Sequence, residues 1–103
     1  MTKYILTWYN IAMKISEFVW DEKNTAHIWR HEVTPEEVES VTFDDDPHFR
    51  KHEKVRYVYG QAYNGKYLFV VLVLRSSEKA YVVTSREMDL AERRLYKKWK
   101  KEN

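Results

Sequence analysis

The chain has 103 residues, of which 44% are hydrophobic, and its formal net charge is +2. This length and composition exclude a disordered chain, and they favour one domain with one core over two domains. With no cysteine, a disulfide framework, a thiolate metal site and a cysteine nucleophile are excluded, which fits a reducing, cytoplasmic location. Only two glycines are present, so glycine-rich phosphate-binding loops are excluded as well.

The first twelve residues lack the charged start and small-residue cleavage site of a secretory signal. We expect residues 1–14 to be an N-terminal extension or an extra edge strand, and residues 15–103 to form one domain. The longest apolar run, Tyr67 to Leu74, is too short to cross a bilayer and predicts a buried strand, so no membrane partner is expected.

Three helices are predicted from their start signals. Asp21 is a suitable N-cap for a helix that ends near His31, after the β-rich segment 15–20. Thr34 and Glu37 form a capping box with Pro35 at the first helical position, and Asp89 with Glu92 forms another. Residues 86–103, which include the last helix, carry seven Lys/Arg against four Asp/Glu, which indicates a local basic face.

Strands are predicted over 48–53, 55–62, 67–74 and 80–84, after an acidic loop at 44–47. Asn64-Gly65 predicts a hairpin with a type I′ turn, in which both residues have positive φ. The order of elements gives an α+β fold: a small antiparallel sheet of about four strands, two N-terminal helices and one C-terminal helix.

Candidate chemistry centres on histidine and arginine. Cleavage of a phosphodiester without metal needs a base, an acid and cations at the phosphate, which these side chains supply. Tyrosines could stack on unpaired bases. The alternative for each is structural: a solvated helix face for the cations and a core position for Tyr96 and Trp99. His27 and His31 are one helical turn apart, but Arg30 between them argues against a metal site, and no cofactor is expected.

Several separated motifs resemble the BrnT toxin family, over residues 17–98. They are Phe18–Asn24, the Arg30-His31 pair followed by 33–39, the strand 65–71, the segment 83–88 and the segment 92–96. The resemblance implies a RelE-like fold and a type II toxin that cleaves RNA and arrests translation. Its partner would be a BrnA-like antitoxin, encoded nearby, which binds operator DNA in the complex.

The resemblance also implies site residues. The expected catalytic residues are His31, Arg75, Arg86, Glu92 and Arg93. The expected RNA-binding residues are Lys23, Arg30, Arg56, Tyr57 and Arg94. Glu92 has the alternative role of completing the helix cap.

Two positions depart from the family pattern. Glu32 stands where the family usually has a glycine, and a non-glycine residue in a left-handed helix-ending conformation costs about 1 kcal/mol. Either the helix ends differently, or His31 takes another orientation. Ser85 replaces a small alanine in the Ser-Ala-Arg motif, and we expect that change to be harmless. The leading function is therefore a metal-independent endoribonuclease; the alternative is a non-catalytic module of the same fold that binds an antitoxin and regulates an operon.

Overall fold

The fold was obtained as a computed structural model, which describes residues 4–8, 11–42, 48–52, 54–75 and 78–102. The strands are β1 (Tyr4–Trp8), β2 (Ile11–Ile15), β3 (Glu17–Val19), β4 (His48–His52), β5 (Val55–Gln61), β6 (Tyr67–Arg75) and β7 (Lys79–Glu87). The helices are α1 (Glu22–Trp29), α2 (Pro35–Thr42) and α3 (Leu90–Glu102). The expected acidic loop at 44–47 lies outside the described residues.

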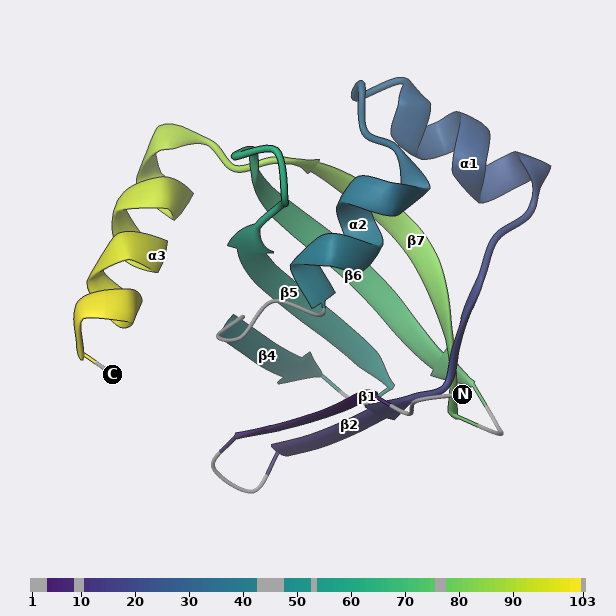
Figure 1. The fold of residues 1–103 in the computed structure, drawn as a ribbon, viewed down its shortest axis with the longest axis horizontal. Helices are drawn as coiled ribbons and strands as arrows, with labels where there is room; N and C mark the ends of the chain where they lie inside the picture. The colour runs from purple at the N-terminus through teal and green to yellow at the C-terminus, as the bar shows by residue number, and fades with distance from the viewer. Residues whose placement is uncertain (1–3, 9–10, 43–47, 53, 76–77, 103) are drawn as a thin grey trace.

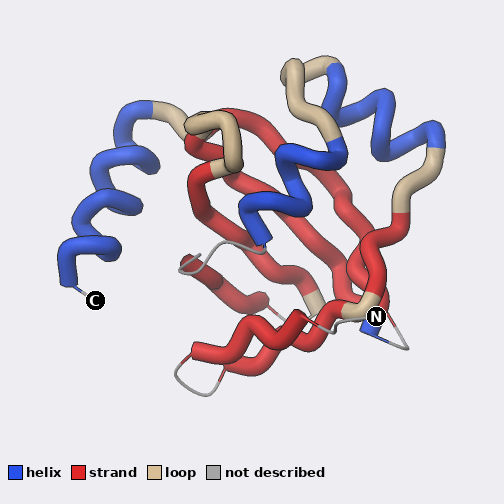
Figure 2. The backbone as a smooth tube through the Cα atoms, viewed as in Figure 1, coloured by secondary structure: helices blue, strands red, loops and turns tan. Residues whose placement is uncertain are grey.

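The main sheet has the strand order β3-β7-β6-β5-β4 (Figure 1). Its last four members in that order, β7 to β4, are antiparallel neighbours, as expected from the sequence. The short β3 adds to the outer edge of β7 in parallel. The α+β class, with two helices before the sheet's central strands and one after them, is thereby confirmed (Figure 2).

One face of the sheet is covered by α1 and α2 and holds the main core (Figure 1). Alternate residues of the central strand, Leu68, Val70 and Leu72, are fully buried there. Ile28 of α1 and Val38 of α2 meet them from the helices. Burying each of these side chains contributes about 1.5–3 kcal/mol to the stability of the fold.

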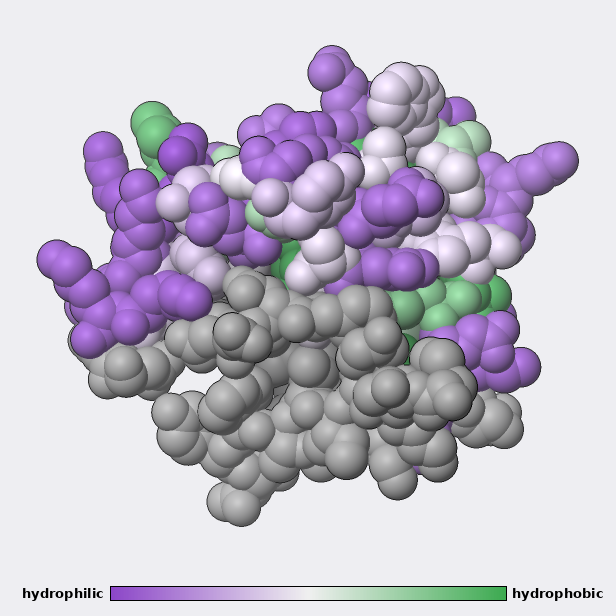
Figure 3. Space-filling view, viewed as in Figure 1, coloured by the Kyte–Doolittle hydropathy of each residue, from purple (hydrophilic) through white to green (hydrophobic). Residues whose placement is uncertain are grey.

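The opposite face, called here the open face, carries a second and more aromatic cluster against α3. Tyr59 and Met88 pack there with Tyr96 of α3, and Trp99 lies at its border. Tyr96 is therefore a core residue, which is the structural alternative considered for it. The surface of α3 shown in Figure 3 is mainly hydrophilic, in keeping with its many lysines.

All three predicted helix starts are confirmed by capping contacts. The Asp21 side chain accepts from the Asn24 backbone N–H at 2.9 Å, and the Asn24 side chain closes the box at 2.8 Å. Thr34 N donates to Glu37 Oε1 at 2.9 Å, and Glu37 N donates to Thr34 Oγ1 at 3.3 Å. The third box, between Asp89 and Glu92, has bonds of 2.9 and 2.8 Å.

The hairpin between β5 and β6 forms where it was expected, but the predicted type I′ turn is wrong. Gly65 has φ of +95°, whereas Asn64 is not among the non-glycine residues with positive φ. Gly65 N donates to Ala62 O, and Ala62 N donates to Lys66 O, which encloses a three-residue loop. This is the geometry of a type I turn followed by a glycine bulge, in which only one residue must be left-handed.

Helix α1 ends in the left-handed conformation that the Glu32 substitution placed in doubt. Glu32 has φ of +60°. Its N–H donates to Trp29 O at 2.8 Å, and the Val33 N–H donates to Ile28 O at 3.1 Å. These two bonds define a Schellman motif, and the buried Ile28 and Val33 supply its apolar contact. The helix therefore ends as it would with glycine, at a conformational cost.

The N-terminal strands β1 and β2 pair with each other as a two-stranded antiparallel sheet of their own. Ile15, at the end of β2, is fully buried in the main core. None of the helices in the described ranges has the length and apolar character needed to cross a membrane.

Candidate functional site

Helix α1 lies along the part of β7 that extends beyond the short β3. Asn24, only 2% exposed, fixes this placement: its Nδ2 donates to Val19 O at 2.9 Å and to Val82 O at 3.1 Å. The oxygen of the Asn24 amide accepts a hydrogen bond from the Asp21 N–H, which is part of the cap of α1. Because an open sheet edge leaves backbone groups unpaired, α1 both covers the edge of β7 and gains a fixed position on it.

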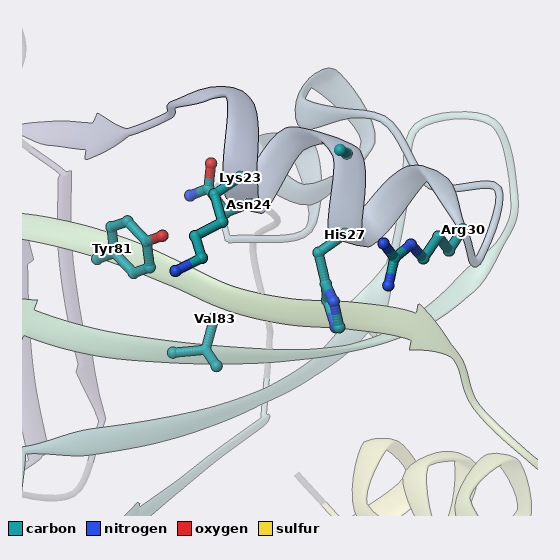
Figure 4. A pocket seen from close by; sticks show the side chains of 7 residues that line it. Lys23, Asn24, His27, Arg30, Tyr81 and Val83 are labelled. Atoms are coloured by element: carbon teal, nitrogen blue, oxygen red, sulfur yellow. The ribbon is translucent and has the colours of Figure 1, made fainter.

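Between α1 and β7 lies a groove of about 480 Å³, called here the α1–β7 groove. Its lining residues are Lys23, Asn24, Ala26, His27, Arg30, Tyr81 and Val83. Figure 4 shows Lys23 and His27 reaching from the helix toward β7, with Arg30 beside them. The walls are thus basic, while Val83 and Tyr81 form an apolar floor.

His27 is held in this groove by one hydrogen bond to β7. Its Nε2 forms a hydrogen bond of 3.0 Å with Thr84 Oγ1 on β7, and its ring lies edge-on to that of His31, with centroids 5.7 Å apart. His31 is exposed at the end of α1. Within the described ranges, no third His, Asp or Glu joins this pair in a group able to hold a metal ion.

An irregularity in β7 lies directly beside Thr84, the hydrogen-bond partner of His27. Val71 pairs with Thr84, but the next residue of β6, Leu72, pairs with Val82. Val83 is therefore an extra residue, a β-bulge, in β7. Because of the bulge, two consecutive residues serve the same groove: Val83 lines it, and Thr84 orients the histidine.

Further along β7, Arg86 forms a two-pronged ion pair with Glu92 at the start of α3. Nη1 and Nη2 donate to Oε1 and Oε2 at 2.7 and 2.9 Å. The hydrogen bonds from Arg86 lower the pKa of Glu92, and those to Glu92 raise the pKa of Arg86. Glu92 Oε1 also accepts from Asp89 N, so the carboxylate serves the cap and the ion pair at once.

Aromatic rings of the open face lie beside this ion pair, in what we call the β6–α3 strip. The Arg86 guanidinium lies over the Phe69 ring at 4.7 Å, and Tyr57 is stacked on Phe69 with centroids 5.9 Å apart. Arg93 and Lys97 approach the ring of Tyr67 at 4.8 and 5.4 Å. These are cation–π contacts, so the strip combines positive charge with half-exposed aromatic surface.

Two expected site residues line neither region: Arg75 reaches the α1–β7 groove only through a residue of its lining, and Arg56 faces inward. Arg75, at the far end of β6, is six residues from Phe69, which is about 20 Å along an extended strand. Its guanidinium instead lies over the Tyr81 ring at 4.3 Å, below the α1–β7 groove. Arg56 is 8% exposed, and its Nη1 donates to Val55 O, so it faces the opposite side of the sheet from Tyr57. Burial lowers the pKa of Arg56.

The structure therefore sorts the expected site residues into groups. Lys23 and Arg30 line the α1–β7 groove, and His31 lies beside His27 just after the end of α1. Arg86, Glu92, Arg93 and Tyr57 belong to the β6–α3 strip, and Arg94 is exposed on α3. Sequence reasoning did not select His27 for catalysis, nor Tyr81, Val83 and Thr84, because the bulge that brings them together leaves no signal in the sequence.

The cations of the two regions differ in their electrostatic partners. Arg86 is paired with Glu92, and Lys66 is paired with the buried Glu37 at 3.1 Å. Over the described residues, no carboxylate lies within ion-pair distance of Lys23 or Arg30. The two groove cations are therefore available to an anionic ligand without breaking an existing ion pair.

Comparisons of the chain with protein-family models, with curated proteins and with solved structures each gave no match. The function of the site therefore has to follow from its own residues and from the motifs of the sequence.

Proposed function

We propose that this chain is an RNA-cleaving toxin of a type II toxin–antitoxin system, with a RelE-like fold and BrnT-like motifs. A BrnA-like antitoxin would neutralise it and bind operator DNA in the complex. The observation that carries the proposal is the α1–β7 groove, where two unpaired cations and an oriented histidine converge. A groove of this kind suits a polyanion whose cleavage requires proton transfer.

The chemistry can be written with the residues of this groove. A neutral imidazole removes the proton of a ribose 2′-hydroxyl, and the 2′-oxygen attacks the adjacent phosphorus. The bond from phosphorus to the 5′-oxygen breaks, and that oxygen takes up a proton. His27, which is hydrogen-bonded to Thr84, would serve as the base, and the exposed His31 one turn away would serve as the acid.

The cations would stabilise the charge that builds up on the phosphate. Lys23 and Arg30 provide this from α1, and Arg30 can offer two parallel N–H donors to two phosphate oxygens. The β6–α3 strip would extend the surface along which a single strand can lie, with Tyr57 and Tyr67 as stacking rings and Arg93 as a phosphate contact. Arg94 would lengthen this contact along α3. We leave Arg56 out of the proposed site because it is buried on the helix face.

The proposal is tested by expression of the isolated chain and by incubation of the purified protein with RNA. Wild type should stop growth and cleave RNA, and co-expression of the antitoxin should restore growth. The double variant Lys23→Gln/Arg30→Gln should lose toxicity. The double variant Lys98→Gln/Lys101→Gln, which removes the same charge from the exposed far part of α3, should stay toxic. Normal growth with wild type, together with intact RNA, would refute the proposal.

A second candidate is a non-catalytic module that binds an antitoxin and regulates an operon. It is favoured by one observation: Arg86, expected to bind phosphate, is already neutralised by the two-pronged contact with Glu92. This candidate predicts a purified protein that binds the antitoxin tightly and leaves RNA intact. The RNA assay above separates the two.

A further inference from the structure

The α1–β7 groove has an arrangement of charge and apolar surface that is more specific than a basic patch. Lys23 and Arg30 are seven residues apart on one helix, hence about 10 Å along its axis, and both line the groove. His27 lies between them, one turn from Lys23. A single small anion would satisfy one end of this row, whereas two phosphates that flank one nucleoside would satisfy both.

The floor beneath this row is apolar and preformed. Val83, the extra residue at the bulge in β7, is 41% exposed and lines the groove. The Tyr81 ring is held from two sides: its hydroxyl donates to Asp21 Oδ2 at 3.4 Å, and the Arg75 guanidinium lies over the ring. A fixed aromatic ring beside an exposed aliphatic side chain offers a base a contact surface at little entropic cost.

Asn24 is the other polar residue of the lining, and its amide is already used. Nδ2 donates to two backbone carbonyls, and Oδ1 accepts from Asp21 N. The groups that remain for a ligand are therefore the two cations, the second ring nitrogen of His27 and the apolar floor. This set recognises phosphate and a flat ring, and the volume of about 480 Å³ lies in the range of small-ligand sites.

We infer that the α1–β7 groove is a subsite for one nucleotide of a single RNA strand. Its base lies against Val83 and Tyr81, and the flanking phosphates meet Lys23 and Arg30. The inference rests on the proposed RNA-directed function and deepens it, because it assigns the main nucleotide contact to α1 and β7 and leaves only further nucleotides of the strand to the β6–α3 strip. It also gives Arg75 a role: its guanidinium lies over the Tyr81 ring and supports that ring without lining the groove itself.

The test uses a ligand that cannot be cleaved, so that binding is read separately from catalysis. The probe is a fluorescein-labelled hexa-uridylate with 2′-O-methyl groups, and its anisotropy is measured with the full chain at several salt concentrations. Lys23→Gln and Arg30→Gln should each weaken binding about tenfold, as expected for loss of a hydrogen bond to a charged group. Each should also reduce the salt slope by about 0.7, since one phosphate contact is lost from a single strand.

Two further variants test the apolar floor of the groove and provide a control on α3. Val83→Glu adds a negative charge to the exposed floor and should weaken binding at least as much as Lys23→Gln. Lys98→Gln, with the same charge change on exposed α3, should bind like wild type. Equal far-ultraviolet circular dichroism and equal urea midpoints establish that each variant is folded.

The outcomes separate this inference from the proposed function. If the groove variants bind like wild type while Arg93→Gln or Lys97→Gln lose affinity, the strand lies on the β6–α3 strip and the inference is overturned. Absence of probe binding by wild type also overturns it. If the probe binds in the groove but RNA is never cleaved, the subsite stands and the catalytic proposal fails.

Discussion

Replacing Glu32 with glycine should stabilise the fold, because Glu32 occupies the left-handed position that ends α1. Its φ of +60° places the Cβ near the following carbonyl, at a cost of about 1–2 kcal/mol for an L-residue. Glycine removes this cost but loses about 0.5–1 kcal/mol through its more flexible unfolded chain. The backbone contacts stay available, including the Glu32 carbonyl that accepts from Lys66 Nζ at 2.8 Å. The net gain should be about 0.5–1 kcal/mol.

The measurement is urea unfolding followed by circular dichroism, at pH 7 and fixed salt. A gain of this size corresponds to a rise of about 2–8 °C in the melting temperature of a domain of this length. Glu32→Ala is the matched control: it removes the same charge but keeps Cβ, so it should show none of the gain. Equal stability of the glycine and alanine variants would refute the reasoning, since charge and not backbone conformation would then explain any change.

Three further predictions concern polar groups that the structure holds in place. Burial would raise the pKa of Glu37, but hydrogen bonds from Thr34 N, Asn64 and Lys66 outweigh it, so the pKa of the folded state is lowered. Its ionised form therefore stabilises the fold above the unfolded pKa of about 4.3, and this stability is lost as the pH falls through the folded pKa. Glu37→Gln should lower the free energy of unfolding by about 1–3 kcal/mol at pH 7. In urea titrations, the difference in free energy of unfolding between the variant and wild type should shrink toward pH 3. A difference that stays constant with pH would contradict this. Asn24→Ala should lower the free energy of unfolding by about 2–3 kcal/mol in the same assay, because two backbone carbonyls and the Asp21 N–H lose their partner. A decrease below about 0.5 kcal/mol would mean that water replaces the amide. Glu92→Gln keeps a capping side chain but removes the carboxylate that pairs with Arg86. The affinity for RNA, measured by anisotropy, should therefore rise while RNA cleavage persists. Loss of cleavage in a folded protein would assign Glu92 to catalysis.

Local signals in the sequence predicted most of the elements. The capping boxes at Asp21, Thr34 and Asp89 depend on contacts within four residues, which the chain makes before any tertiary structure is considered. The hairpin at Asn64-Gly65 was located by the same kind of signal. Its turn type was wrong because the bulge after Asn64 depends on how β5 and β6 pair, which is not a local property.

The candidate site depends on register and was predictable only in part. Alternation in β5 indicates that Arg56 and Tyr57 face opposite sides, but it does not say which side the helices cover. The bulge at Val83 shifts the pairing of β7 by one residue directly beside Thr84, the hydrogen-bond partner of His27. A strand pattern read from the sequence does not show where a bulge falls, so it does not reveal which residues of β7 line the groove.

Whether a cation is already paired with a carboxylate decides how well it can bind an anionic strand. Charge counting gave the C-terminal helix the greatest weight, since seven basic residues gather between 86 and 103. The structure shifts that weight, because the Arg86 charge is neutralised by Glu92, whereas Lys23 and Arg30 face the α1–β7 groove beside an exposed apolar floor. An ion pair must be broken before Arg86 can bind a phosphate, and that cost is subtracted from its contribution to binding. The groove cations carry no such cost, so they should dominate the affinity of this chain for a phosphate-bearing ligand although they are fewer.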